Sequence, residues 1–145
     1  MKAYFTRAYT LSASHRLHSE DLTEEENRAA FGKCNNPFGH GHNYRVEVTV
    51  AGPIDAETGM VMNMVDLDRV VGERVLARFD HANLNLDPLF GRQVSTTENF
   101  CIAIYELLKP VIGKTGTDGA RLETVRIEET ENNFFEYSGD GGSSN

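Results

Sequence analysis

The stretch from Cys34 to Val50 constrains the fold more than any other part of this chain. Its second half, residues 45–50, alternates polar and apolar side chains, the pattern of a strand with one buried face. If that strand runs back through Gly41, His40 and His42 lie on the same face as Tyr44 and the valines. Two imidazoles on an apolar, inward face indicate a metal site; a pair of hydrogen-bonded core histidines is the alternative.

A third imidazole belongs with this pair. The run Ser12-Ala13-Ser14-His15 closes another short strand pattern, so His15 can lie beside His40 and His42. Three neutral imidazoles suit Zn²⁺ and leave a fourth position for water or substrate, which is typical of a catalytic rather than a structural zinc. Cys34 adds a thiol six residues before His40. It is either a reactive group near the metal or a small buried filler.

Composition predicts one small domain. The chain has 145 residues, 39% hydrophobic and 25% charged, with a net charge of -8. The negative charge disfavours nucleic acid and anionic membranes as partners. No apolar run approaches the length of a transmembrane helix, and the N-terminus lacks the apolar core of a signal peptide. With two cysteines there is no disulfide framework, so we expect a cytoplasmic protein.

Periodicity predicts two strands, two helices and two further strands. Residues 4–13 and 42–52 form an antiparallel pair around a short acidic insertion, in which Thr23 and Glu26 have capping-box spacing. Residues 60–64 add an extended piece, and a helix starts at Asp66 with an apolar face made of Leu67, Val70, Val71 and Val75.

The second half of the chain continues this order. A second capping box, Ser95 to Glu98, opens another helix that Pro110 stops. Cys101 lies inside its apolar pattern and is expected to be a core residue. Residues 122–129 and 134–137 form a hairpin. Residues 1–139 are then a single catalytic domain, and 140–145 form a polar, glycine-rich, disordered tail.

Seven motifs resemble the 6-pyruvoyl-tetrahydropterin synthase family. They occur in the family's order from about residue 9 to Gly139: SASHRL at 12–17, FGKCNNP at 31–37, GHGHNY at 39–44, GMVMN at 59–63, DHANL at 80–84, STTEN at 95–99 and ETENN at 129–133. The resemblance implies an α+β tunnelling fold (T-fold), an antiparallel four-stranded sheet with two helices in the order ββααββ. It also implies that subunits join edge to edge into a barrel, and that two trimers form a homohexamer.

The resemblance also implies a reaction. Family members eliminate triphosphate from 7,8-dihydroneopterin triphosphate, and oxidation of the side chain reduces the pterin ring without an external reductant. Carried over to this chain, His15, His40 and His42 bind Zn²⁺, Cys34 is the base, and Asp80 and His81 complete the catalytic group. Histidine suits proton transfer because its pKa lies near neutrality.

Substrate-binding residues follow partly from the residues themselves. Glu129 shares strand parity with Val125 and Ile127 and should face the pocket, whereas Glu128 should face solvent. A buried carboxylate needs partners, and a pterin offers two adjacent N–H donors. The resemblance assigns Glu129 as the pterin anchor.

Other residues near the motifs are weaker candidates. The resemblance places Thr96 and Thr97 near the pterin, although capping a helix would also explain them. Arg16 and Lys33 flank the motifs and are candidates for triphosphate contacts. His18 is expected at the surface and is not a metal ligand.

Three functions stay open. The first is the pyruvoyl synthase of tetrahydrobiopterin biosynthesis, favoured by the insertion Glu20 to Phe31 and by Asn132-Asn133. The second is the related 6-carboxy-tetrahydropterin synthase of queuosine biosynthesis, which uses the same substrate and zinc. The third is a non-catalytic zinc-binding assembly module, which would need neither Cys34 nor the Asp80-His81 pair. Phe38 departs from the polar residue common in the family at this position.

Overall fold

The computed structural model describes residues 1–115 and 119–140. In this part of the chain the strands are β1 (Lys2–His15), β2 (His40–Pro53), β3 (Ala82–Asn83), β4 (Arg121–Thr130) and β5 (Asn133–Tyr137). The α-helices are α1 (Glu24–Phe31), α2 (Met64–Val71), α3 (Ala77–Phe79) and α4 (Thr97–Thr115). A π-helical turn (Gly72–Leu76) joins α2 to α3, and 3₁₀ turns cover Gly32–Asn35, Leu84–Leu86 and Pro88–Phe90.

The strands form one mixed sheet in the order β3-β1-β2-β4-β5. β1 and β2 pair antiparallel over their whole lengths, from Lys2 opposite Pro53 to His15 opposite His40. The prediction of a four-stranded antiparallel sheet was therefore wrong. The sheet has a fifth strand, β3, which pairs parallel with Ala13 and Ser14 of β1. Two residues are too few to show an alternating pattern, so the sequence gives no signal for β3.

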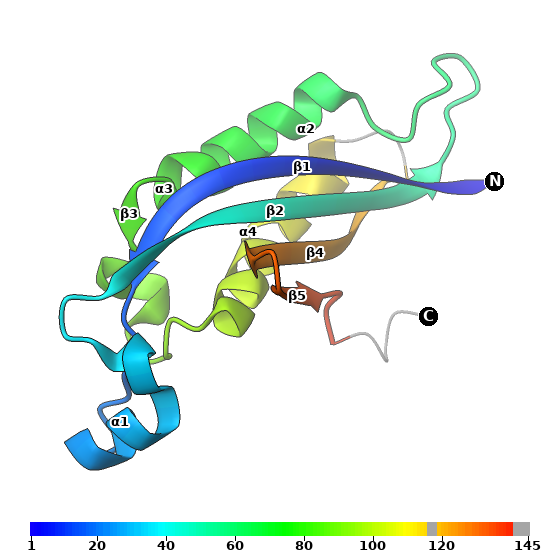
Figure 1. The fold of residues 1–145 in the computed structure, drawn as a ribbon. Helices are drawn as coiled ribbons and strands as arrows, with labels where there is room; N and C mark the ends of the chain where they lie inside the picture. Colours follow the sequence, from blue (N-terminus) through cyan, green and yellow to red (C-terminus); the bar gives the residue numbers. More distant parts are fainter. Residues whose placement is uncertain (116–118, 141–145) are drawn as a thin grey trace.

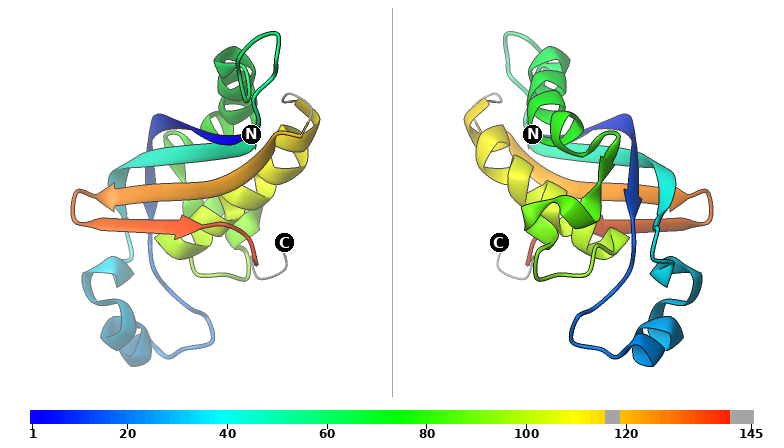
Figure 2. Two further views of the ribbon diagram at one scale, coloured as in Figure 1. Left: turned by 90° about the vertical axis from the view of Figure 1, so that its right-hand side faces the viewer. Right: turned by 90° about the vertical axis from the view of Figure 1, so that its left-hand side faces the viewer.

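The helices α2 and α4 cover one face of the twisted sheet (Figures 1 and 2). The core lies between these layers, where Tyr44, Val46, Val48 and Val50 of β2 are fully buried. The predicted apolar face of the first long helix, Leu67, Val70, Val71 and Val75, is also buried. From α4, Phe100, Ile104 and Leu108 pack into the same cluster. The alternation in β2 and the helical periodicity therefore gave the correct inward faces.

Several predicted boundaries were wrong. Residues 60–63 form no strand, and α2 starts at Met64 rather than Asp66, because the Asn63 side chain accepts a hydrogen bond from Val65 N at 2.8 Å and caps the helix. Pro110 lies inside α4 and does not stop it. The helix continues because its next turn buries Ile112 completely.

The cap of α4 also differs from the prediction. Thr96, not Ser95, caps the helix: its Oγ1 accepts a hydrogen bond from Asn99 N at 3.1 Å. Ser95 instead donates its hydroxyl to the carbonyl oxygen of Arg16 at 3.3 Å. This contact ties the start of α4 to the end of β1.

The insertion between β1 and β2 projects from the body of the molecule and carries α1 (Figure 1). The predicted Thr23–Glu26 capping box is present, with bonds of 3.1 and 2.8 Å. The fully buried Asn27 holds the insertion together through hydrogen bonds to Ser19, Leu22 and Thr23. The insertion is therefore an ordered element beside the end of β1.

The hairpin of β4 and β5 is confirmed. The predicted tail, 140–145, lies outside the described residues except for Asp140. No helix within residues 1–115 and 119–140 has the length and hydropathy needed to cross a membrane.

Candidate functional site

The histidines His15, His40 and His42 converge where β1 ends and β2 begins. Strand register places His15 opposite His40 and Ala13 opposite His42, so the three side chains share the inward face. One nitrogen of each ring lies within 4.8 Å of the other two, and Nε2 of His15 is 3.1 Å from Nε2 of His40. The sequence prediction that these imidazoles lie together is confirmed.

Gly39 allows this close approach. Its φ is +75°, and a Cβ there would lie 3.1 Å from the carbonyl oxygen of His15. Gly41 is different, because a Cβ there would make an ordinary contact of 3.6 Å with the carbonyl oxygen of Ala13. Only the first of the two glycines is required by the geometry.

The protein fixes the orientation of the His15 ring. Its Nδ1 lies 2.6 Å from the carbonyl oxygen of Ser95 and must donate a proton to it, which leaves Nε2 with its lone pair directed at the other imidazoles. Burial lowers the pKa values of both His15 and His40, and the charge of His42 adds to this lowering in each. Burial therefore favours the neutral imidazole at His15 and His40, the form that binds metals.

The nitrogen spacing suits zinc. Two nitrogens bound tetrahedrally to Zn²⁺ at about 2.05 Å lie roughly 3.3 Å apart. The observed 3.1 Å between the Nε2 atoms of His15 and His40 is close to that value. The donor set, three imidazoles without a thiolate, matches a zinc site with one position left open.

Glu129 of β4 reaches the same cluster. Its Oε2 is 3.8 Å from Nε2 of His15 and 3.7 Å from Nε2 of His42. Thr97, at the start of α4 and buried, donates its hydroxyl to Oε2 at 2.5 Å. Glu129 thus lies beside the histidines, as its strand parity predicted.

The neighbouring glutamate points elsewhere. Glu128 forms ion pairs with Arg45 at 3.1 Å and Arg126 at 3.9 Å on the outer face. It is not free in water as expected, but it does lie outside the site. The two threonines also differ, since Thr96 caps α4 whereas Thr97 holds Glu129.

Tyr44 was predicted only as an inward core residue, but its hydroxyl lies within the site. The residue is fully buried, and its hydroxyl donates toward Nε2 of His15 at 3.5 Å. Burial raises the pKa of Tyr44, and the nearby charges of Glu129 and Cys34 raise it further. Tyr44 is therefore a neutral donor. Its shared parity with His40 and His42 was the signal that could have identified it.

The two cysteines have different environments. Cys34 is partly exposed in the 3₁₀ turn Gly32–Asn35, and its carbonyl oxygen accepts a hydrogen bond from Leu17 N at 2.7 Å. Cys101 is buried in α4, where its thiol donates to the carbonyl oxygen of Val125 at 3.1 Å. Burial raises the pKa of Cys101 to about 12, so it is the inert core residue expected.

Asp80 and His81 lie at the other edge of β1. An Asp80 oxygen accepts a hydrogen bond from Ser12 N at 2.8 Å and lies 3.1 Å from Nδ1 of His81. The bond from Ser12 N is the main reason why the pKa of Asp80 is lowered. His81 has a φ of +63° and a side chain that is 82% exposed. Both residues lie beside Ser12 of β1, and His81 lines a cavity of about 480 Å³ together with His42.

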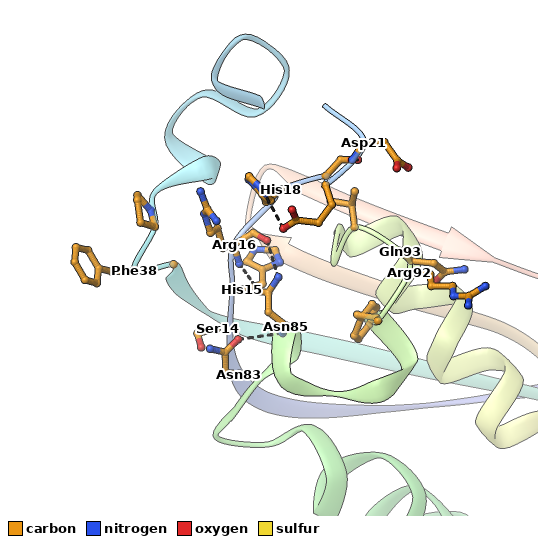
Figure 3. Close-up of a pocket in the computed structure, with 17 residues that line it drawn as sticks. Ser14, His15, Arg16, His18, Asp21, Phe38, Asn83, Asn85, Arg92 and Gln93 are labelled. Atoms are coloured by element: carbon orange, nitrogen blue, oxygen red, sulfur yellow. Dashed lines mark hydrogen bonds and ion pairs between the residues drawn. The ribbon is translucent and has the colours of Figure 1, made fainter. Parts of the chain in front are cut away.

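A cavity of about 750 Å³ opens beside His15, between the insertion and the loop before α4 (Figure 3). Arg16, His18 and Arg92 line it together with the acidic Asp21 and others. The predicted surface residue His18 is only 20% exposed, because its ring packs against Asn35, 3.0 Å from Nδ1 to Nδ2. Phe38 lies at the rim of the cavity and is 96% exposed.

Comparisons with known proteins agree with this arrangement. A family profile described as 6-pyruvoyl tetrahydropterin synthase matches residues 4–140. Proteins named 6-pyruvoyl tetrahydrobiopterin synthase from Homo sapiens and Poecilia reticulata are 48% and 46% identical, covering 96% and 94% of this chain and 93% and 90% of theirs. The solved structure of the Caenorhabditis elegans 6-pyruvoyl tetrahydropterin synthase superposes with a TM-score of 0.88 at 40% identity, covering 97% of both chains. The chain belongs to the 6-pyruvoyl tetrahydropterin synthase family.

Proposed function

We propose that this protein is a 6-pyruvoyl-tetrahydropterin synthase, a lyase of tetrahydrobiopterin biosynthesis. It eliminates triphosphate from 7,8-dihydroneopterin triphosphate and forms 6-pyruvoyl-tetrahydropterin. The two products contain all atoms of the substrate, so no external reductant takes part. The observation that carries the proposal is Glu129 within 3.8 Å of two of the three clustered histidines, in a chain 46–48% identical to synthases of that name.

The metal of this site is Zn²⁺, held by His15, His40 and His42. When bound, it supplies a Lewis acid for the oxygens of the substrate side chain. The purified protein should contain about one zinc per chain, as the three-imidazole site implies. The His40→Ala/His42→Ala variant should lose it by elemental analysis; full zinc in that variant would contradict the assignment.

The residues around the histidines have distinct tasks. Glu129, held by Thr97, binds the pterin N–H groups, and Thr96 fixes the helix start that carries Thr97. Cys34 removes a proton from the side-chain carbon. His81, with Asp80 beside it, returns protons to the substrate.

Asp80 and His81 act at a contact between subunits, where the 82% exposed side chain of His81 is open to a neighbouring chain. The outer edge of β5 and most of the outer edge of β1 are unpaired within the described residues, and open edges favour association. The assembly is a homohexamer, a dimer of trimers in which the sheets join into a barrel. We place the enzyme in the cytoplasm, without nucleic acid or membrane partners.

One experiment separates the three candidate functions. The zinc-loaded protein is incubated with 7,8-dihydroneopterin triphosphate, and the products are identified by mass spectrometry. A reduced pterin that keeps the three-carbon side chain supports the pyruvoyl synthase. A one-carbon carboxylate would indicate the 6-carboxy-tetrahydropterin synthase, and unchanged substrate would indicate a non-catalytic zinc-binding module.

A further inference from the structure

A second cavity, of about 450 Å³, lies between the end of β1 and the insertion. Three cationic side chains line it, Arg16, Arg28 and Lys33, and Glu24 is its single carboxylate. The ion pairs found within residues 1–115 and 119–140 use other arginines and leave these three cations unpaired. Three unpaired cations around one hollow are notable in a chain with a net charge of -8.

Hydrogen bonds hold the wall of this cavity in place. Asn35 is buried and donates Nδ2 to the carbonyl oxygen of Leu17 at 2.7 Å. Arg16 donates Nε to the carbonyl oxygen of Asn35 at 3.1 Å, and its two terminal nitrogens make no hydrogen bond with the described residues. Arg16 is therefore braced at one nitrogen and can offer the other two to an anion.

Residues that line this cavity are close in sequence to residues of the proposed active site. Arg16 follows the histidine His15, and Lys33 precedes Cys34. Pro37, which also lines the cavity, lies three residues before His40. The lining residues therefore border, in sequence, a proposed metal ligand and the proposed base.

The larger cavity beside His15 is less suited to an anion. It shares Arg16, His18 and Pro37 with the smaller one, and Figure 3 shows Arg16 next to His15 and His18. However, Glu20 and Asp21 also line it, and their carboxylates would repel phosphate. The balance of charge is clearly positive only in the smaller cavity.

We propose that the cavity lined by Arg16, Arg28 and Lys33 binds the triphosphate group of the substrate. The three cations lack an anionic partner, and phosphate oxygens carry negative charge. Arginine binds two phosphate oxygens at once through two parallel N–H bonds. The choice of an oligophosphate rests on the function proposed above. The cavity and its unpaired cations do not.

Inorganic triphosphate is the probe, titrated by calorimetry into the zinc-loaded protein at low ionic strength. The Arg28→Gln/Lys33→Gln variant removes two lining charges and leaves the braced Arg16 in place. We expect it to weaken triphosphate binding at least about tenfold. The matched control, Lys109→Gln/Lys114→Gln, removes two charges from α4 and should bind within about twofold of the unsubstituted protein.

A second measurement separates this inference from the proposed function. The Arg28→Gln/Lys33→Gln variant should bind 7,8-dihydroneopterin, which has no phosphate, as the unsubstituted protein does, while its KM for the triphosphate substrate rises at least about tenfold. The unsubstituted protein could bind triphosphate through Arg28 and Lys33 and yet show no turnover. That result would support the proposed binding cavity and refute the proposed synthase activity. Normal turnover with equal triphosphate binding by both double variants would refute the cavity alone, as would an unsubstituted protein that does not bind triphosphate.

Discussion

Glu129 and Glu128 provide a stringent test, because adjacent glutamates in one strand are assigned opposite roles. Glu129→Gln keeps the shape of the side chain, removes its charge and replaces one acceptor oxygen with a donor. That donor would oppose the N–H groups of a bound pterin. The side chain of Glu129 is 17% exposed and already accepts the short bond from Thr97, so the pterin contact is charge-assisted and partly shielded from water.

The expected loss follows from that contact. A hydrogen bond to a charged group contributes about 1.5–3 kcal/mol, which corresponds to a weakening of binding of about 10- to 150-fold. Glu128→Gln removes an ion pair with Arg45, whose side chain is 54% exposed, and such pairs contribute about 0–1 kcal/mol to stability. Pterin binding by this variant should stay within about twofold.

The assay is a titration of 7,8-dihydroneopterin into both variants, with zinc measured in each. Equal binding by the two variants, or a greater loss in Glu128→Gln, would refute the reasoning from strand parity. Loss of zinc from Glu129→Gln would also refute it, because the carboxylate would then belong to the metal site.

The remaining predictions concern the thiols, the assembly and acid stability. Cys34→Ala should keep zinc and lose about 10²–10⁴ in turnover, because a base is removed, whereas Cys101→Ala should stay active. At pH 8 a thiol reagent should modify Cys34 but not Cys101, whose pKa is raised to about 12; equal modification would contradict this. Light scattering should give about six times 16.1 kDa, and a stable, active monomer would contradict the shared site. Hydrogen bonds from Arg7 lower the pKa of Asp68 below 3.8, so its stabilisation is present above that pH and is lost as the pH falls below it. Both side chains are about 40% exposed, so Asp68→Asn should cost less than about 1 kcal/mol at pH 7. Urea unfolding of the two proteins should converge in acid, whereas a constant difference would contradict this.

Local sequence patterns predicted the main strands and helices of this protein and their buried faces, because each pattern depends on a few adjacent residues. The alternation from Arg45 to Val50 gave the buried face of β2 and, extended backwards, the shared face of His40 and His42. Thr23 and Glu26 gave a capping box that the structure contains. The motifs gave the family, which the comparisons confirm.

Predictions from single residues failed where packing overrode local preference. Pro110 usually ends a helix, but burial of Ile112 in the next turn keeps α4 helical. The two-residue strand β3 depends on contacts between distant parts of the chain, because it pairs with Ala13 and Ser14 and the preceding His81 N donates to the carbonyl oxygen of Ser12.

The sequence by itself determined on which face of their strands His15, His40, His42 and Glu129 lie. Only the tertiary structure decided what holds and surrounds them. The carbonyl oxygen that orients His15 belongs to Ser95, 80 residues away, and the hydroxyl that holds Glu129 of β4 comes from Thr97 of helix α4. Strand parity is a property of the local backbone. Such contacts instead depend on how β1, β4 and α4 pack together, and the periodicity of one segment does not determine which distant residues it contacts.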